Sequence, residues 1–219
     1  MKKILVTGAN RGIGLELCRQ LAGRGDEVIA VCRKGSEELS SLGLRVIEGI
    51  DVADDESVQR LRERLGPEKL DWLINNAGIL AKDSLDQLNF DAMERQFRVN
   101  TLGPLRVTSA LLPSLGKGSK IGIITSRMGS ISDNTSGGYY GYRVSKAAVN
   151  MAGMSLARDL QARGIAVALL HPGMVATDMT GGSGVPVQQS AAGLIKRMDE
   201  LDMEHTGGFW HAEGQALPW

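Results

Sequence analysis

Short apolar runs alternate with amphipathic segments along the whole sequence. Several runs are rich in Val and Ile and lack polar alternation, a pattern typical of strands buried on both faces. The predicted strands are 3–8, 27–33, 44–49, 71–78, 120–126, 165–173 and 208–214. Between them lie helical patterns, such as the stripe of Ile13, Leu17 and Leu21. The predicted helices are 13–23, 56–65, 91–112, 141–163 and 187–203.

This alternation of strands and helices determines the expected fold class. Parallel strands joined by helical crossovers form a sheet that is covered on both faces. We therefore expect an α/β, Rossmann-type, doubly wound, seven-stranded parallel sheet with helices on both faces. The 219 residues suit one domain spanning 1–219. Only 180–186 is dense in glycine without periodicity, and we expect that stretch to be mobile.

The composition excludes several function classes. Twenty-five basic residues balance 25 acidic ones, whereas a general nucleic-acid binder normally carries a basic excess. The two cysteines, Cys18 and Cys32, lack metal-ligand spacing, so we expect reduced thiols and no metal site. No apolar run approaches the length of a membrane span. We expect a cytoplasmic protein that binds neither nucleic acid nor membrane.

The first predicted strand runs directly into the glycine-rich turn TGANRGIG, 7–14. Gly8, Gly12 and Gly14 punctuate this turn, and a predicted helix follows. Missing side chains let the backbone approach a pyrophosphate, and the free N–H groups of a helix start favour its charge. A tight turn without any ligand is the alternative interpretation. The position at the first strand–helix turn of a parallel sheet favours a dinucleotide site.

Four motifs together resemble the short-chain dehydrogenase/reductase family. The glycine spacing is G-x-x-x-G-x-G, and NNAG (75–78), YRVSK (142–146) and HPGMVAT (171–177) follow in the family's order. Within the family, GSISDNTSGGYYGYRVSK and the ending LPW are similar to C-factor-like proteins and sniffer-type carbonyl reductases. The resemblance implies a dinucleotide-binding oxidoreductase. It also implies a substrate loop near 178–187, which is short in this chain.

The end of the second strand indicates which nicotinamide cofactor to expect. NAD-preferring folds usually place an acid there, which binds the ribose 2′-hydroxyl. Here Cys32 occupies that place, and Arg33 and Lys34 follow. A guanidinium binds a 2′-phosphate, and Arg11 in the glycine turn lies within reach of the same group. We therefore favour NADP(H) over NAD(H), with a solvated basic loop as the alternative.

The resemblance implies further cofactor contacts. Asp51 after the third strand falls where the family contacts adenine, while Asp54 or Asp55 serves as a helix cap. Small residues after the fourth strand are expected beneath the adenine ribose, and Thr177 near the phosphate or the nicotinamide amide. The full expected set is Gly8, Asn10, Arg11, Gly12, Ile13, Gly14, Arg33, Asp51, Val52, Asn76, Ala77, Gly78, Tyr142, Lys146, Pro172, Gly173, Val175 and Thr177.

All three tyrosines lie within four positions, Tyr139, Tyr140 and Tyr142. A free phenol has a pKa of about 10, and a nearby cation lowers it. Only Tyr142 has a lysine, Lys146, four residues later on the predicted helix, where the two share a face. A chance surface pair is the alternative interpretation. We expect Tyr139 and Tyr140 to form pocket wall on the preceding loop.

The resemblance implies a catalytic set of Ser126, Tyr142, Lys146 and Asn100. Tyr142 exchanges a proton with the carbonyl oxygen, and Lys146 lowers the Tyr142 pKa and holds the nicotinamide ribose. Ser126 polarises the carbonyl, but its gap to Tyr142 is longer than usual in the family, so Ser130 stays open. Asn100 lies in a helix that Gly103 and Pro104 disturb, which frees backbone groups to hold a water. We assign no catalysis to His171.

The resulting prediction is an NADP(H)-dependent oxidoreductase acting on small or medium apolar carbonyl or alcohol compounds. A cofactor-binding, C-factor-like signalling or regulatory protein with incidental catalysis is the main alternative. A sugar-nucleotide epimerase is the third possibility, and the short chain and the glycine pattern disfavour it. Family members often pair through helices equivalent to 91–112 and 141–163. The sequence therefore predicts a homodimer or homotetramer.

Overall fold

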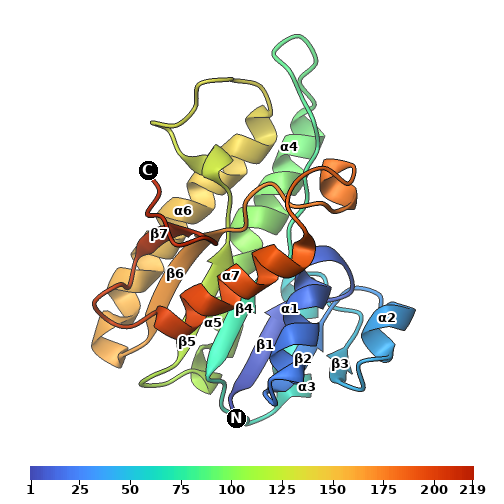
Figure 1. The fold of residues 1–219 in the computed structure, drawn as a ribbon, viewed down its shortest axis with the longest axis vertical. Helices are drawn as coiled ribbons and strands as arrows, with labels where there is room; N and C mark the ends of the chain where they lie inside the picture. The colour runs from blue at the N-terminus through green and yellow to red at the C-terminus, as the bar shows by residue number, and fades with distance from the viewer.

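A computed structural model describes residues 1–219 and contains seven strands and seven α-helices (Figure 1). The strands are β1 (Lys3–Thr7), β2 (Glu27–Val31), β3 (Arg45–Ile47), β4 (Trp72–Asn75), β5 (Lys120–Ile124), β6 (Ala166–His171) and β7 (Gly208–His211). The helices are α1 (Gly12–Gly23), α2 (Glu37–Ser40), α3 (Asp55–Leu65), α4 (Phe90–Phe97), α5 (Gly103–Leu111), α6 (Tyr140–Leu160) and α7 (Val187–Glu200).

All seven strands join one parallel sheet in the order β3-β2-β1-β4-β5-β6-β7. Strand β1 is third in this order and pairs with β2 on one side and with β4 on the other, so that Ile4 lies between Val28 and Trp72. Successive strands are added on one side of β1 up to β3 and on the other side from β4 onward, so the strand order reverses between β1 and β4. Ligands of open α/β sheets bind beyond the carboxyl ends of the strands at such a reversal. The predicted fold class is confirmed.

Two apolar clusters cover the faces of the sheet. Strand residues alternate between them, so Ile4 and Val6 belong to one cluster and Leu5 to the other. The first cluster includes side chains of α1 and α7, and the second includes side chains of α3, α5 and α6. Figure 1 shows α1 and α7 on the near face of the sheet. Because both faces are buried, the strands carry the near-continuous apolar runs seen in the sequence.

All seven predicted strands end later in the sequence than the observed ones. The predicted run 71–78 forms a strand only over Trp72–Asn75, and the run 165–173 only over Ala166–His171. The glycine and polar residues at these ends leave the sheet and become loops at its carboxyl edge. The four-residue helix α2 was not predicted, because it is too short to show periodicity.

The predicted helix 91–112 is divided into three parts. Helix α4 continues into a π-helical turn over Arg98–Leu102, and α5 begins at Gly103. The predicted disturbance near Gly103 and Pro104 is confirmed, but it takes the form of a wider turn rather than a break. Such π-helical turns occur frequently at functional sites. Asn100 lies within this one.

Candidate active site

The glycine turn after β1 packs against the segment after β4. A Cβ atom on Gly8 would lie 2.8 Å from the Cα of Ala77, and Gly8 has a positive φ of 67°. A Cβ on Gly14 would lie 2.2 Å from the Gly8 carbonyl oxygen. The Asn76 amide donates to that same oxygen at 3.2 Å. Side chains at Gly8 and Gly14 are therefore excluded by backbone atoms, which keeps the turn bare.

Helix α1 begins at this turn without a cap. Arg11 at its N-cap position makes no side-chain cap, and the first turn contains no acidic residue. By contrast, Asp54 caps α3 and Asn89 caps α4 with their own side chains. The first amides of α1 are thus open to an anion, as the sequence predicts.

A cleft of about 950 Å³ extends from this turn across the carboxyl edge of the sheet. Every residue predicted to contact the cofactor lines it except Gly173 and Val175. Gly173 instead faces His211, and Val175 is buried in a bridge to Val185. Bare glycine backbone, an uncapped helix start and a cleft of this size fit a dinucleotide cofactor.

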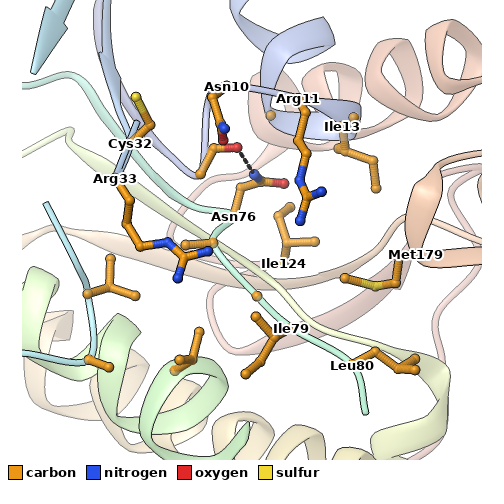
Figure 2. A pocket seen from close by; sticks show the side chains of 18 of the residues that line it. Asn10, Arg11, Ile13, Cys32, Arg33, Asn76, Ile79, Leu80, Ile124 and Met179 are labelled. Atoms are coloured by element: carbon orange, nitrogen blue, oxygen red, sulfur yellow. Dashed lines mark hydrogen bonds between the residues drawn. The ribbon is translucent and has the colours of Figure 1, made fainter. Parts of the chain in front are cut away.

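Four arginines line the cleft, and two of them, Arg11 and Arg33, reach it from different walls. Figure 2 shows Arg33 beside Cys32 on one side and Arg11 from the glycine turn on another. Arg11 forms an ion pair with Asp178 at 3.4 Å, and both side chains are exposed. Lys34 does not line the cleft.

Asp51 lines the cleft and accepts a hydrogen bond from the Ala53 N–H, while Asp54 caps α3. Separate acids therefore occupy the position expected for the adenine contact and the helix-cap position.

Tyr142 is the third residue of α6 and is almost wholly buried. Burial raises the pKa of its phenol to about 12, and hydrogen bonding with the Ser126 side chain acts in the opposite direction. Ser126 is itself buried and also accepts a hydrogen bond from the Met128 N–H at 3.1 Å. Ser130 instead bonds to Asp133 and Ser132 within its own loop. Of the two candidate serines, the structure brings Ser126 to Tyr142.

Lys146 lies one helical turn beyond Tyr142, with its ammonium 5.7 Å from the centre of the Tyr142 ring. It donates to the carbonyl of Ile124 at 2.9 Å, and burial lowers its pKa to about 8. The net pKa of Tyr142 is raised rather than lowered, because burial of the phenol dominates. The lowering that the resemblance implies for Lys146 stays a prediction.

Asn100 connects the π-helical turn by hydrogen bonds to the segment after β4 and to helix α6. Its side chain accepts from the Ile79 N–H and donates to the Ile79 carbonyl, each at 2.8 Å. It also donates to Ser145 Oγ at 3.0 Å, and Ser145 donates to the carbonyl of Tyr142 at 2.8 Å. Pro104, four residues after Asn100, has no N–H, so the Asn100 carbonyl lacks its usual helical partner.

Several residues that hold the site were not predicted. Ser145 links Asn100 to Tyr142, and its only sequence signal is a polar residue on the buried face of the helix beside Lys146. Thr7 accepts from the N–H groups of Asn76 and Ala77 at 3.0 and 3.1 Å, which ties β1 to the segment after β4. Asp83 caps α6 from a distant loop.

The tyrosines before Tyr142 lie differently from the prediction. Tyr140 is the first residue of α6 rather than part of the preceding loop, and Tyr139 precedes the helix with a left-handed backbone. Neither lines the cleft. His171 is neutral at physiological pH, because burial lowers its pKa to about 3.

The predicted substrate loop packs over the glycine turn. A single helical turn over Asp178–Thr180 follows Thr177, whose methyl group would lie 3.4 Å from a Cβ on Gly12. Val185 pairs with the chain at Met174 and Ala176 through bonds of 2.8 and 3.0 Å. Met179 and Val187 line the cleft from this loop. Figure 2 shows Met179 above Leu80 at one end of the pocket.

No group of three or more His, Cys, Asp or Glu side chains is arranged to hold a metal ion. None of the helices combines the length and apolar character needed to span a bilayer.

Comparisons with known proteins agree with this geometry. A family model described as short chain dehydrogenase matches residues 2–185. The 1-hydroxy-2-glutathionyl-2-methyl-3-butene dehydrogenase of Rhodococcus sp. (strain AD45) is 46% identical over 226 residues, covering 100% of both chains. The C-signal protein of Myxococcus xanthus is 46% identical over 154 residues, covering 68% of this chain and 93% of the relative.

Solved structures show the same fold over the whole chain. The carbonyl reductase Sniffer of D. melanogaster superposes with a TM-score of 0.93 at 31% identity, covering 100% of both chains. The NADPH-bound carbonyl reductase from chicken fatty liver superposes with a TM-score of 0.91 at 32% identity, covering 100% of this chain and 99% of the other. The predicted resemblance is confirmed, including the sniffer-type and C-signal relatives.

Proposed function

The chain belongs to the short chain dehydrogenase family of oxidoreductases, and from that premise we propose that it is an NADP(H)-dependent carbonyl reductase. One observation carries the proposal. The buried side chains of Tyr142 and Lys146 line the same cleft as a bare glycine turn, and the buried Ser126 hydrogen-bonds with Tyr142. This arrangement joins a proton donor to a dinucleotide-shaped site.

The residues of the cleft divide between holding the cofactor and handling a proton. The nicotinamide supplies or accepts the hydride when the cofactor is bound. The glycine turn and the uncapped start of α1 would hold the pyrophosphate. Asp51 and Val52 would contact the adenine, and the Asn76–Gly78 segment would lie beneath its ribose.

Two cationic side chains support the preference for NADP(H). Arg33 lines the cleft in the position where NAD-binding folds usually have an acid, and Arg11 lines it from the glycine turn. A guanidinium binds a phosphate through two parallel hydrogen bonds and would leave the 2′-hydroxyl of NAD(H) with weaker contacts. The chicken carbonyl reductase, with the same fold, binds NADPH.

Tyr142 is the proposed acid and base. With a pKa of about 12 the phenol carries its proton at neutral pH, ready to donate it to a carbonyl oxygen as hydride reaches the carbon. The carbonyl thereby becomes an alcohol, and the resulting phenolate must be reprotonated. Ser126 would hydrogen-bond the same oxygen and stabilise the negative charge that develops there.

Lys146 and Asn100 are the proposed route for the returning proton. With a pKa of about 8 Lys146 is mostly charged at neutral pH, and its charge would stabilise a phenolate 5.7 Å away, measured to the ring centre. The Asn100 carbonyl, deprived of its helical partner by Pro104, would hold a water that links Lys146 to solvent. Lys146 would also hydrogen-bond the nicotinamide ribose.

The walls of the cleft support apolar carbonyl substrates of small or medium size. Ile79, Leu80, Met179 and Val187 contribute apolar side chains to its lining. The Rhodococcus relative is named for a hydroxy compound that carries a glutathionyl group. The proposed range therefore extends beyond apolar compounds to alcohols and carbonyls that carry such a polar group, in either reaction direction.

A cofactor-binding regulatory protein is a second candidate. The specific observation that favours it is the 46% identity to the protein named C-signal. Screening aldehydes, ketones and quinones with NADPH and with NADH separates the two. The proposed reductase oxidises NADPH with at least one carbonyl class. Tight NADPH binding without turnover of any member of the panel would favour the regulatory candidate.

Association through α4 and α6 stays a prediction. Exposed apolar side chains on these helices support it, namely Phe90, Phe97, Val144 and Met151. Phe90 and Phe97, and likewise Val144 and Met151, are seven residues apart and share a helix face.

A further inference from the structure

The segment Asn76–Asp83, called here the β4 strap, is tied to its surroundings by several hydrogen bonds, four of which connect it to the glycine turn, Asn100, α4 and α6. The bonds are Asn76 Nδ2 to the Gly8 carbonyl at 3.2 Å, Ile79 N–H to Asn100 Oδ1 at 2.8 Å, Ala81 N–H to Gln96 Oε1 at 2.9 Å, and Asp83 to the start of α6. The strap thus contacts the cofactor turn at one end and the helix of the proposed acid at the other.

The start of α6 has no cap of its own. Tyr139 at the N-cap position has a positive φ of 52°, and its side chain does not cap the helix. Asp83 supplies the cap from the strap. Its carboxylate accepts from the N–H groups of Tyr140 and Gly141, the latter at 2.9 Å, and its carbonyl accepts from the Tyr139 N–H at 3.1 Å. One residue therefore binds three consecutive amides at the helix start.

Packing fixes the same turn of helix from the side of α4. A Cβ atom on Gly141 would lie 2.5 Å from Gln96 Nε2 and 2.7 Å from Met93 Cγ. Arg143 holds the preceding loop by donating to the carbonyls of Gly137 and Gly138. Figure 1 shows α4 and α6 side by side, with the loops before them beyond the edge of the sheet. The helix start therefore has little freedom while the Asp83 cap is in place.

We propose that Asp83 is a positioning residue that holds the phenol of Tyr142 in register with Ser126. The inference rests on the proposed function, in which Tyr142 is the acid. Tyr142 directly follows the capped Gly141, so loosening the helix start displaces the phenol. Nothing in the sequence near Asp83 indicates this role, because its partners are 56 to 58 positions away.

Removing the charge of Asp83 has a definite electrostatic sign. The charged groups around the helix start are Asp83, Arg143 and Lys146, while His171 remains neutral. Loss of a negative charge at the helix start favours the phenolate, and a frayed helix start admits water, which also favours it. Loss of the Ser126 hydrogen bond acts in the opposite direction, but burial is the larger cause of the Tyr142 shift, so the net expectation is a lower pKa of Tyr142.

The tyrosine content of the chain allows a direct test. Tyr139→Phe and Tyr140→Phe together leave Tyr142 as the only tyrosine in the chain. Phenolate absorbance then reports Tyr142 ionisation without any turnover, while circular dichroism verifies the fold at each pH. In this background Asp83→Asn is compared with Asp86→Asn, which removes an exposed charge on the same loop. We expect the Tyr142 phenol to ionise at lower pH in Asp83→Asn than in the parent. In Asp86→Asn it should ionise at the same pH as in the parent.

Kinetics in the otherwise natural chain supply the second measurement. Asp83→Asn should lower kcat by about tenfold to a hundredfold, as misplaced catalytic groups do, with the Kd for NADPH within about twofold of the parent. A kcat equal to that of Asp86→Asn overturns the proposal. If the unmodified protein reduces no carbonyl, the proposed function fails by itself. The absorbance titration then decides, and identical curves for the two variants overturn the role of Asp83.

Discussion

Replacing Gly14 by alanine is a severe perturbation of the proposed cofactor site. The new Cβ would lie 2.2 Å from the Gly8 carbonyl oxygen and 2.5 Å from Asn76 Nδ2. The oxygen cannot easily retreat, because Gly8 packs against Ala77 and accepts the Asn76 amide. Overpacking of this kind costs about 1–3 kcal/mol. If that strain is relieved by shifting the start of α1, NADPH binds roughly 5- to 150-fold more weakly.

Gly23→Ala is the matched control on the same helix. Nothing lies within 4 Å of a Cβ at Gly23, so alanine there meets no obstacle. Because alanine is the better helix former, we expect about 0.5–1 kcal/mol of added stability and unchanged NADPH affinity. Calorimetric titration with NADPH and thermal unfolding measure both quantities in the two variants.

The comparison separates a local from a general effect. A Gly14→Ala protein that is folded and binds NADPH as tightly as Gly23→Ala would refute the reasoning. In that case the glycine turn is not where the pyrophosphate lies.

Three further predictions concern the cofactor, the serine and the lysine. Arg33→Ala should weaken NADPH binding by about 10- to 150-fold through loss of charge-assisted bonds of about 1.5–3 kcal/mol, and should leave NADH binding nearly unchanged. Lys34→Ala is its control, and equal losses for both cofactors would contradict the preference. Ser126→Ala should lower kcat by about a hundredfold or more, as loss of an oxyanion donor does, whereas Ser130→Ala should retain most activity; the reverse order would reassign the serine. Lys146→Met tests burial of the ammonium. The folded pKa of Lys146, about 8, lies below its ordinary value of 10.5, so the unfolded chain holds more protons between these values and stability rises with pH there. The free energy of unfolding of the parent minus that of Lys146→Met should therefore increase from pH 8 to 10.5, by on the order of 3 kcal/mol. Urea unfolding across this range measures it, and a flat or falling difference would show that the ammonium is not desolvated.

The parts of the site that were predictable from sequence are those with local spacing. Gly8, Gly12 and Gly14 after an apolar run predict the glycine turn. Lys146, one helical turn after Tyr142, predicts the role of that tyrosine. The cofactor contact of Arg33 is predictable because the end of the second strand has a fixed place in this fold. Each of these signals lies within a few residues along the chain.

The rest depends on contacts between distant segments. Ser126 and Ser130 both follow β5, and only the folded path of the loop brings one of them to Tyr142. Asp83 resembles an ordinary loop acid, because its partners belong to α6. The raised pKa of Tyr142 likewise follows from burial, which spacing alone does not reveal.

Single-turnover oxidation of NADPH by Tyr142→Phe tests the central claim most directly. The variant keeps the ring that packs in the buried site and removes only the hydroxyl. The account predicts NADPH binding close to that of the parent, with carbonyl reduction slowed by at least about a hundredfold, as expected for loss of the general acid. Reduction at a rate near that of the parent, with the same carbonyl substrate and bound NADPH, would contradict the assignment of Tyr142 as the acid.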